Sequence, residues 1–255
     1  MATFLFDDIV FGPVKSRRLG NSLGINLLPL KEKVCNFNCV YCECGWTFAG
    51  HDKLPSAAFI HERMEKEISR LAEANTPVDV ITFAGNGEPT MHPEFESIIE
   101  HAVKLRNTYF KDAEIAVLTN ATLLHKETVE RALLKADMAI LKFDSAFENT
   151  MRLLNQPVGA FNYERYLKNI RNFPGKKVIQ TMFVRYKTAE TEVDNTSDEE
   201  INAWLDELDV IQPDLVMIYS IARDTPDPAV QAIPHKTLMG IAKKAESRGF
   251  KTEVS

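Results

Sequence analysis

The sequence predicts an α/β protein built around a parallel β-sheet, and three observations support that prediction. Segments with strand composition alternate with segments of helical periodicity six times along the 255 residues, which is typical of βαβ units. Several strand segments are apolar at successive positions, as a sheet covered on both faces requires. Because the carboxyl ends of parallel strands meet at one edge, the polar residues located there should form one site. These residues are Cys35, Glu88, Asn120, Asp144 and Arg223.

Each predicted element has a local signal. Short apolar runs rich in β-branched residues predict strands at 23–28, 78–84, 113–118, 138–143, 178–184 and 215–221. Apolar residues at three- and four-residue intervals predict helices at 55–75, 92–110, 126–136, 163–172, 199–208 and 235–248. Pro93 suits the first turn of the second helix, and Gly249 suits the C-terminal cap of the last. Residues 187–198 are polar and acidic and predict a mobile loop, and 251–255 are too few to assign.

The order of elements leaves the shape of the sheet open. Right-handed crossovers between parallel strands give either an open, doubly wound sheet or a curved partial barrel. The alternation alone does not choose between these two folds.

The composition is that of an ordinary soluble globular protein, with 45% apolar and 26% charged residues. The net charge of −6 argues against broad nonspecific binding of nucleic acid, which needs a basic surface. We expect no membrane association, because no apolar run reaches the roughly eighteen residues of a spanning helix. The acidic N-terminus does not match a signal peptide, so we expect a cytoplasmic protein. In that compartment, clustered thiols are typically metal ligands or catalysts rather than disulfides.

All four cysteines, Cys35, Cys39, Cys42 and Cys44, lie within ten residues. A structural zinc site is one interpretation, with His51 as a possible further ligand, but zinc ligands usually come as two pairs far apart in sequence. A redox pair of Cys39 and Cys42 is another, and it leaves two thiols without a role. Three thiolates in a tight loop instead favour an iron–sulfur cluster with one open iron. We assign no role to Cys44.

Two motifs then point to a family. The C-x₃-C-x₂-C motif has an aromatic residue, Tyr41, directly before its third cysteine and comes after the first predicted strand. The second motif, Gly85-Asn86-Gly87-Glu88-Pro89, comes after the next strand. In this order and on these elements, the two motifs resemble those of the radical S-adenosylmethionine (radical SAM) superfamily. The resemblance implies a (β/α)₆ partial TIM barrel that forms a single domain over residues 1–255, with 1–22 leading into the first barrel strand.

The resemblance also implies the cofactors and the reaction. Cys35, Cys39 and Cys42 would hold a [4Fe–4S] cluster whose open iron chelates S-adenosylmethionine (SAM). The reduced cluster would cleave SAM to methionine and a 5′-deoxyadenosyl radical, which abstracts hydrogen from a substrate. We therefore expect an enzyme of the oxidoreductase or lyase type that takes electrons from a donor such as flavodoxin or ferredoxin.

SAM-binding residues are implied in the same way. Gly85 and Gly87 would let the backbone approach the methionine end of SAM, and Glu88 would bind its ammonium group. For Lys142 and Asp144 a structural ion pair is an alternative. The further residues that the resemblance places around SAM are Tyr41, Asn120, Lys142 and Asp144.

The N-terminal runs 12–20 and 22–25 together resemble the signature of a subgroup that includes relatives of enzymes that build the wyosine base on transfer RNA. Three substrate classes stay open: a small molecule, a peptide or protein as in glycyl-radical activation, and transfer RNA. A zinc-binding structural protein is the alternative outside enzymes. From charge alone, Arg17 and Arg18 are solvated surface residues, whereas a guanidinium fork for a carboxylate or phosphate is the functional interpretation. The resemblance favours their facing the pocket.

Overall fold

Six parallel strands form the centre of the fold, as the sequence predicts. The computed structural model describes residues 4–16, 18–47 and 53–255. Its main sheet has the order β1-β2-β3-β4-β5-β6-β9-β11. Strand β1 (Val10–Ser16) pairs antiparallel with β2 at one edge, and β11 (Thr252–Val254) pairs parallel with β9 at the other. The six central parallel strands are β2 (Gly20–Ile25), β3 (Val80–Phe83), β4 (Glu114–Thr119), β5 (Met138–Lys142), β6 (Lys177–Met182) and β9 (Leu215–Tyr219).

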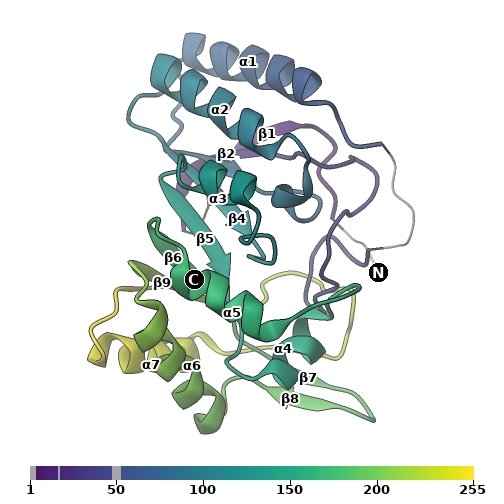
Figure 1. The fold of residues 1–255 in the computed structure, drawn as a ribbon, viewed down its shortest axis with the longest axis vertical. Helices are drawn as coiled ribbons and strands as arrows, with labels where there is room; N and C mark the ends of the chain where they lie inside the picture. Colours follow the sequence, from purple (N-terminus) through teal and green to yellow (C-terminus); the bar gives the residue numbers. More distant parts are fainter. Residues whose placement is uncertain (1–3, 17, 48–52) are drawn as a thin grey trace.

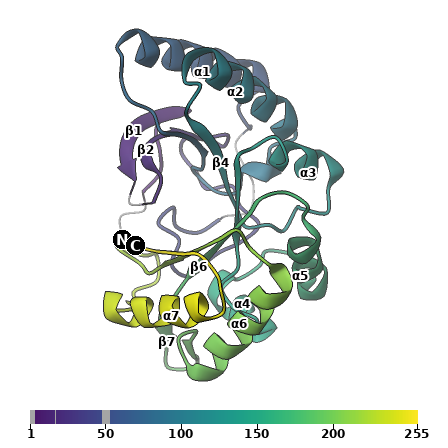
Figure 2. The same ribbon diagram turned by 90° about the vertical axis from the view of Figure 1, so that its left-hand side faces the viewer.

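The helices lie along the outside of this curved sheet (Figures 1 and 2). This arrangement is a (β/α)₆ partial barrel, so the fold implied by the resemblance is confirmed. The helices are α1 (Ala57–Glu73), α2 (Phe95–Tyr109), α3 (Glu127–Leu133), α4 (Glu148–Asn155), α5 (Tyr163–Asn172), α6 (Asp198–Ile211) and α7 (His235–Ser247), with a short 3₁₀ turn, η1 (Pro89–Met91), before α2.

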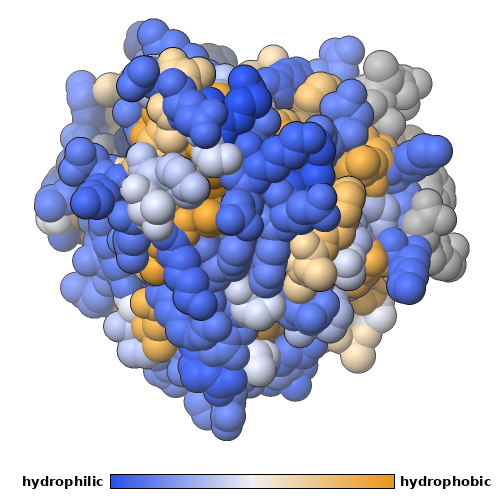
Figure 3. Space-filling view, turned by 90° about the horizontal axis from the view of Figure 1, so that it is seen from above, coloured by the Kyte–Doolittle hydropathy of each residue, from blue (hydrophilic) through white to orange (hydrophobic). Residues whose placement is uncertain are grey.

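Local sequence explains where these helices begin and which face they bury. The hydroxyl of Ser56 accepts a hydrogen bond from Phe59 N at 3.3 Å and caps α1, and Ser197 caps α6 in the same way. The outer faces meet solvent, and the side seen in Figure 3 is mostly hydrophilic with scattered apolar residues. Among the described residues, no helix is both long and apolar enough to cross a membrane.

The two faces of the sheet carry different side chains because successive residues of a strand point to opposite sides. One face packs against the helices in the main core, for example through Ile81 and Ile115. The other face holds a smaller apolar cluster that includes Val80, Ala116 and Ile140. Every second residue of a strand points to the same face, and on this second face the residues at the carboxyl ends of the strands are polar. The candidate site lies there.

Several elements differ from the sequence-based expectation. The segment 187–198, expected to be a mobile loop, contains the short strand β8 (Glu192–Asp194). This strand belongs to a second, three-stranded sheet in which β7 (Val184–Lys187) lies in the middle and pairs with β8 on one side and with β10 (Val230–Ala232) on the other. The strand expected at 178–184 is two strands, β6 and β7, separated by Phe183. The sequence missed α4, β10 and β11 because such short elements depend on partners distant in sequence rather than on their own periodicity. It also missed β1, which pairs with the adjacent β2 but contains Gly12 and Pro13, two residues that are typical of turns.

Candidate active site

A cavity of about 290 Å³ lies at the carboxyl ends of the parallel strands. The structure therefore brings together the polar residues at the ends of separate strands, as the sequence predicts. Asp144 is the exception, because it lies next to the cavity without lining it. The predicted site residues that line the cavity are Cys35, Cys39, Tyr41, Cys42, Gly85, Gly87, Glu88, Asn120 and Lys142.

The cysteine loop comes after β2 and is fixed by backbone hydrogen bonds to two distant segments. Val34 N donates to Asn86 O at 2.9 Å, which attaches the start of the loop to the glycine-rich motif. Val40 N donates to Leu154 O at 2.9 Å, which attaches its middle to α4. The unpredicted helix α4 thus supports the cysteines directly.

The four thiols are free and partly or fully buried. Burial raises the pKa of Cys35 to about 12 and also raises the pKa of Cys39. A hydrogen bond with Cys44 and the nearby ammonium of Lys33 lower the pKa of Cys42 to about 5 despite its burial. Cys44 also donates to Gly85 O, at 3.4 Å. The surroundings therefore favour the thiolate of Cys42 and disfavour the thiolates of Cys35 and Cys39.

Lys33 places a positive charge against this thiol group. Its side chain is buried, and its ammonium donates to Gly45 O at 3.0 Å. Burial alone would lower the pKa of Lys33, but the charges of Cys42, Cys35 and Cys39 raise it above its usual value. A buried cation beside several thiolates offsets their mutual repulsion in a low-dielectric environment.

The cysteines of the C-x₃-C-x₂-C motif, Cys35, Cys39 and Cys42, all line the cavity from three positions along the loop. Within residues 4–16, 18–47 and 53–255, no group of three or more Cys, His, Asp or Glu side chains is arranged to hold one metal ion. His51, considered above as a zinc ligand, lies outside the described residues.

Both glycines of the second motif are required by close packing. A Cβ atom on Gly85 would lie 2.4 Å from Asn26 Oδ1, and one on Gly87 would lie 1.9 Å from Val34 O. Gly87 also has φ = +136°, a conformation that residues with a Cβ rarely adopt. Between them, Asn86 is fully buried and donates from its side chain to Pro29 O at 2.8 Å. The motif is therefore a rigid loop held against the cysteine loop.

Glu88 is buried, with 2% of its surface exposed, and it lines the cavity. Its carboxylate accepts hydrogen bonds from Thr90 N (3.1 Å), Thr90 Oγ1 (2.5 Å), Thr119 Oγ1 (2.7 Å) and Asn120 N (2.6 Å). Burial raises the pKa of Glu88, although these four hydrogen bonds oppose that shift. No Lys or Arg among the described residues forms an ion pair with it. The carboxylate is thus oriented by neutral donors and suited to a cationic ligand.

Asn120 lies between the cysteine loop and Glu88. Its backbone N–H donates to Glu88, and its side chain donates to Asn36 Oδ1 at 2.6 Å and to Cys35 Sγ at 3.7 Å. Its side-chain oxygen accepts a hydrogen bond from Thr122 Oγ1 at 2.7 Å. The residue couples the positions of the first thiol and the carboxylate.

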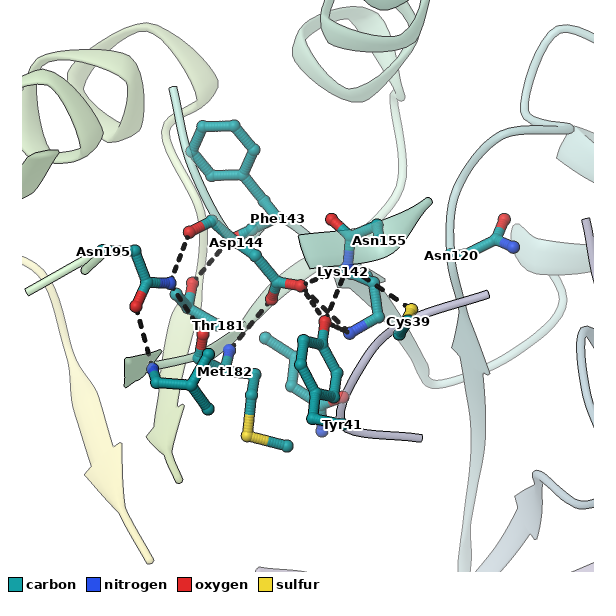
Figure 4. A network of polar contacts seen from close by, with 12 residues as sticks. Cys39, Tyr41, Asn120, Lys142, Phe143, Asp144, Asn155, Thr181, Met182 and Asn195 are labelled. Carbon is teal, nitrogen blue, oxygen red and sulfur yellow. Dashed lines mark hydrogen bonds and ion pairs between the residues drawn. The ribbon is translucent and has the colours of Figure 1, made fainter. Parts of the chain in front are cut away.

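Tyr41 and Lys142 meet in a polar network on the β5 side of the cavity (Figure 4). The Tyr41 hydroxyl donates to Asp144, and the Lys142 ammonium donates to Tyr41 Oη at 2.9 Å and to Asp144 Oδ2 at 3.4 Å. Asn155 of α4 donates to Tyr41 Oη, Asp144 Oδ2 and Cys39 Sγ. Lys142 and Asp144 thus form the ion pair considered as their alternative role. The SAM contacts assigned to Tyr41, Lys142 and Asp144 stay predictions.

Asp144 also organises the protein around it. Its second carboxylate oxygen accepts from Met182 N at 2.9 Å, and its backbone oxygen accepts from Asn195 Nδ2 at 3.0 Å (Figure 4). With its side chain fully buried, Asp144 fixes the ends of β5 and β6 and the orientation of Tyr41.

Two residues outside the predicted cluster and SAM contacts also line the cavity, although for Gln180 the sequence favours a buried core amide over a pocket residue. Gln180 and Tyr219 line it, and the Tyr219 hydroxyl donates to Gln180 Oε1 at 3.3 Å. The two-residue periodicity of β6 and β9 would have found both. Arg18 also lines the cavity, so its pocket-facing interpretation is correct, whereas Arg17 lies outside the described residues. Nothing in the local sequence indicates the role of Asn155, which depends on the packing of α4.

Comparison with protein families gives a match over most of the chain. A family model described as the Radical SAM superfamily matches residues 33–196. A UPF0026 protein of Methanocaldococcus jannaschii is 34% identical over 183 residues, which cover 69% of this chain and 54% of that protein. A UPF0026 protein of a Synechocystis species is 33% identical over 226 residues, covering 85% and 77% of the two chains. The chain spans about a third to just over half, 31% to 56%, of the length of four of its curated relatives.

Solved structures share the fold at low sequence identity. A structure of TYW1 with a lysine-pyruvate adduct bound has a TM-score of 0.62 and 13% identity, and it covers 89% of this chain and 73% of that one. A structure of anSMEcpe with bound AdoMet, which is SAM, has a TM-score of 0.55 and 15% identity, with coverage of 91% and 64%. At these identities the similarity concerns the fold alone.

Proposed function

Because the chain belongs to the radical SAM superfamily, we propose that it binds a [4Fe–4S] cluster through Cys35, Cys39 and Cys42 and uses it to cleave SAM reductively. The observation that carries the proposal is the convergence of two loops on one cavity. The cysteine loop and the glycine-rich loop are joined by a bridge between Val34 and Gly87, so thiols and a buried carboxylate line the same space.

The bound cluster would supply one electron to the sulfonium of SAM, which yields methionine and a 5′-deoxyadenosyl radical that takes hydrogen from the substrate. The residues of the chain bind and orient the reactants. Lys33 offsets the negative charge of the thiolates and favours the assembly of three of them in one buried place. Asn120 and Asn155 donate to Cys35 and Cys39 and thereby orient two of the three sulfurs.

The methionine end of SAM would lie against the glycine-rich loop. Glu88 presents a carboxylate whose oxygens are already oriented by neutral donors, so the incoming ammonium supplies its counter-charge. Gly85 and Gly87 let the backbone of this loop pack closely against Asn26 and Val34, which holds the loop at the wall of the cavity. The network of Tyr41, Lys142 and Asp144 would then form the wall of the cavity on the side where the adenosine of SAM lies.

The remaining assignments rest on this chemistry. A one-electron carrier such as flavodoxin or ferredoxin would reduce the cluster, and we propose that the enzyme acts in the cytoplasm, where thiols stay reduced. We propose that residues 1–255 act as one domain of the oxidoreductase or lyase type. Transfer RNA and a peptide are alternative substrates, but we propose a small molecule, because the net charge of −6 disfavours a polyanion such as transfer RNA.

The proposal is tested by anaerobic reconstitution with iron and sulfide, reduction, and addition of SAM. We expect iron and acid-labile sulfide to bind in equal amounts, with subsequent release of methionine and 5′-deoxyadenosine. Binding of zinc in place of iron, or an intact cluster that never cleaves SAM, would contradict the proposal.

Glu88→Gln is expected to weaken SAM binding about ten- to a hundred-fold while the cluster is retained. The reason is that a hydrogen bond to a charged group contributes roughly 1.5–3 kcal/mol, and the amide removes that charge. Equilibrium dialysis of the reconstituted protein with SAM measures the dissociation constant, and iron analysis confirms the cluster.

Glu200→Gln is the matched control. Glu200 is also a buried carboxylate with a raised pKa that accepts hydrogen bonds from two hydroxyls, Ser145 and Thr150, but it lies outside the cavity. Its substitution should leave SAM affinity unchanged. If both variants bind SAM as the wild type does, Glu88 does not bind the ammonium.

A further inference from the structure

The cavity holds four cationic side chains among the described residues, and three of them are already partnered. Lys33 bonds Gly45 O and faces the thiols. Lys142 pairs with Asp144, and Arg223 pairs with Glu43 at 2.6 Å. The fourth cation is Arg18, which comes after β1 and differs from the other three.

The guanidinium of Arg18 lacks a hydrogen-bonding partner in the part of the chain that the structure describes. Its Nη1 atom is shielded from solvent and has no acceptor, and the residue forms no ion pair within 4.0 Å. Glu253 of β11 is a nearby carboxylate, but it interacts with Arg18 only electrostatically. A buried donor without an acceptor destabilises the protein, so an acceptor supplied by a ligand would be favourable.

Arg18 is also held in place. Its guanidinium carbon lies 4.4 Å from the centre of the Tyr219 ring, in a cation–π contact. The Tyr219 hydroxyl in turn donates to Gln180, so the ring is fixed from its other end. A stacked guanidinium loses less conformational entropy when it binds a ligand, because its plane is already oriented.

The position of this cation separates it from the residues proposed for the methionine end of SAM. Glu88 comes after β3 and is bonded by Asn120 at the end of β4. Tyr219 ends β9, and strands β4, β5 and β6 lie between β3 and β9 in the sheet. Arg18 therefore faces the opposite half of the same cavity, where a second reactant would lie.

We propose that Arg18 binds an anionic group, a carboxylate or a phosphate, on a small substrate in the β9 half of the cavity. Carboxylates and phosphates match the guanidinium fork, which donates two parallel hydrogen bonds to either group. The cavity would accept the anionic end of a small molecule beside SAM. This inference rests on the proposed function, because it assigns the substrate class of that same site.

The test uses the reconstituted protein with two probe anions, inorganic phosphate and acetate. Dissociation constants are measured by line broadening of the phosphorus or carbon resonance of each probe. Arg18→Gln is compared with the wild type and with Arg152→Gln, a matched control in which an arginine stacked on Phe161 outside the cavity is changed. SAM affinity and SAM cleavage are measured on the same samples.

We expect saturable binding of at least one anion to the wild type, weakened about ten- to a hundred-fold in Arg18→Gln. Arg152→Gln should bind as the wild type does, and Arg18→Gln should keep its affinity for SAM. Should Arg18→Gln fail to fold, Arg18→Lys keeps the charge without the fork and should still weaken binding.

Three results would overturn the inference: no saturable anion binding to the wild type, equal binding to the Arg18 variants, or a parallel loss of SAM affinity. The last result would assign the guanidinium to the carboxylate of SAM. Failure of the wild type to assemble a cluster or to cleave SAM would instead contradict the proposed function, so the two failures are distinguishable.

Discussion

Cys39→Ala is expected to abolish cluster assembly and, with it, all cleavage of SAM. Cys39 is the most buried of the three proposed ligands, and Asn155 orients its sulfur at 3.4 Å. An open iron needs the other three irons held by the protein, and two thiolates do not hold a four-iron cluster in place. Iron and acid-labile sulfide after anaerobic reconstitution measure the effect, with 5′-deoxyadenosine as the second measurement.

Cys44→Ala is the matched control for this prediction. Cys44 lines the same cavity, but its thiol bonds Gly85 O and Cys42. Its removal should leave the iron content unchanged. A cluster that survives in Cys39→Ala and disappears in Cys44→Ala would show that the three ligands are a different set.

Gly87→Ala is expected to destabilise the folded protein by roughly 2–6 kcal/mol and to prevent cluster assembly, because strain at such a position costs about 1–3 kcal/mol and overpacking costs about as much again. The new methyl group would lie 1.9 Å from Val34 O, and the backbone at φ = +136° would be strained in addition. Relief requires Val34 to move, and Cys35 would move with it. Urea denaturation measures the free energy of unfolding, and iron analysis measures the cluster.

Gly159→Ala is the control that distinguishes the two causes of the effect of Gly87→Ala, the steric clash with Val34 and the backbone strain. Gly159 also has a positive φ, +80°, but a Cβ there would meet nothing within 4 Å. Its substitution should cost only about 1–2 kcal/mol, the penalty of a left-handed conformation for a residue with a Cβ. Equal losses of stability in the two variants would mean that the contact between Gly87 and Val34 does not restrain the two loops.

Much of the fold could be predicted from the sequence because long helices and buried strands carry strong periodic signals. The helix at 163–172 matches α5 at both ends, and the six central strands were expected in their correct order. The short elements could not be predicted. Strand β11 exists because it pairs with β9, and β8 exists because it pairs with β7. Their stability comes from partners far away in the chain.

Local sequence patterns were enough to identify the chemical groups of the candidate site and their order. The spacing of Cys35, Cys39 and Cys42 and the motif at 85–88 are such patterns, and a parallel sheet brings the loops at the carboxyl ends of its strands to one edge. The partners of these groups became known from the three-dimensional structure alone. Lys142 pairs with Asp144, Asn155 reaches Cys39, and Arg18 lacks an acceptor among the described residues. Such partnerships depend on side chains brought together by packing, which no spacing along the chain encodes.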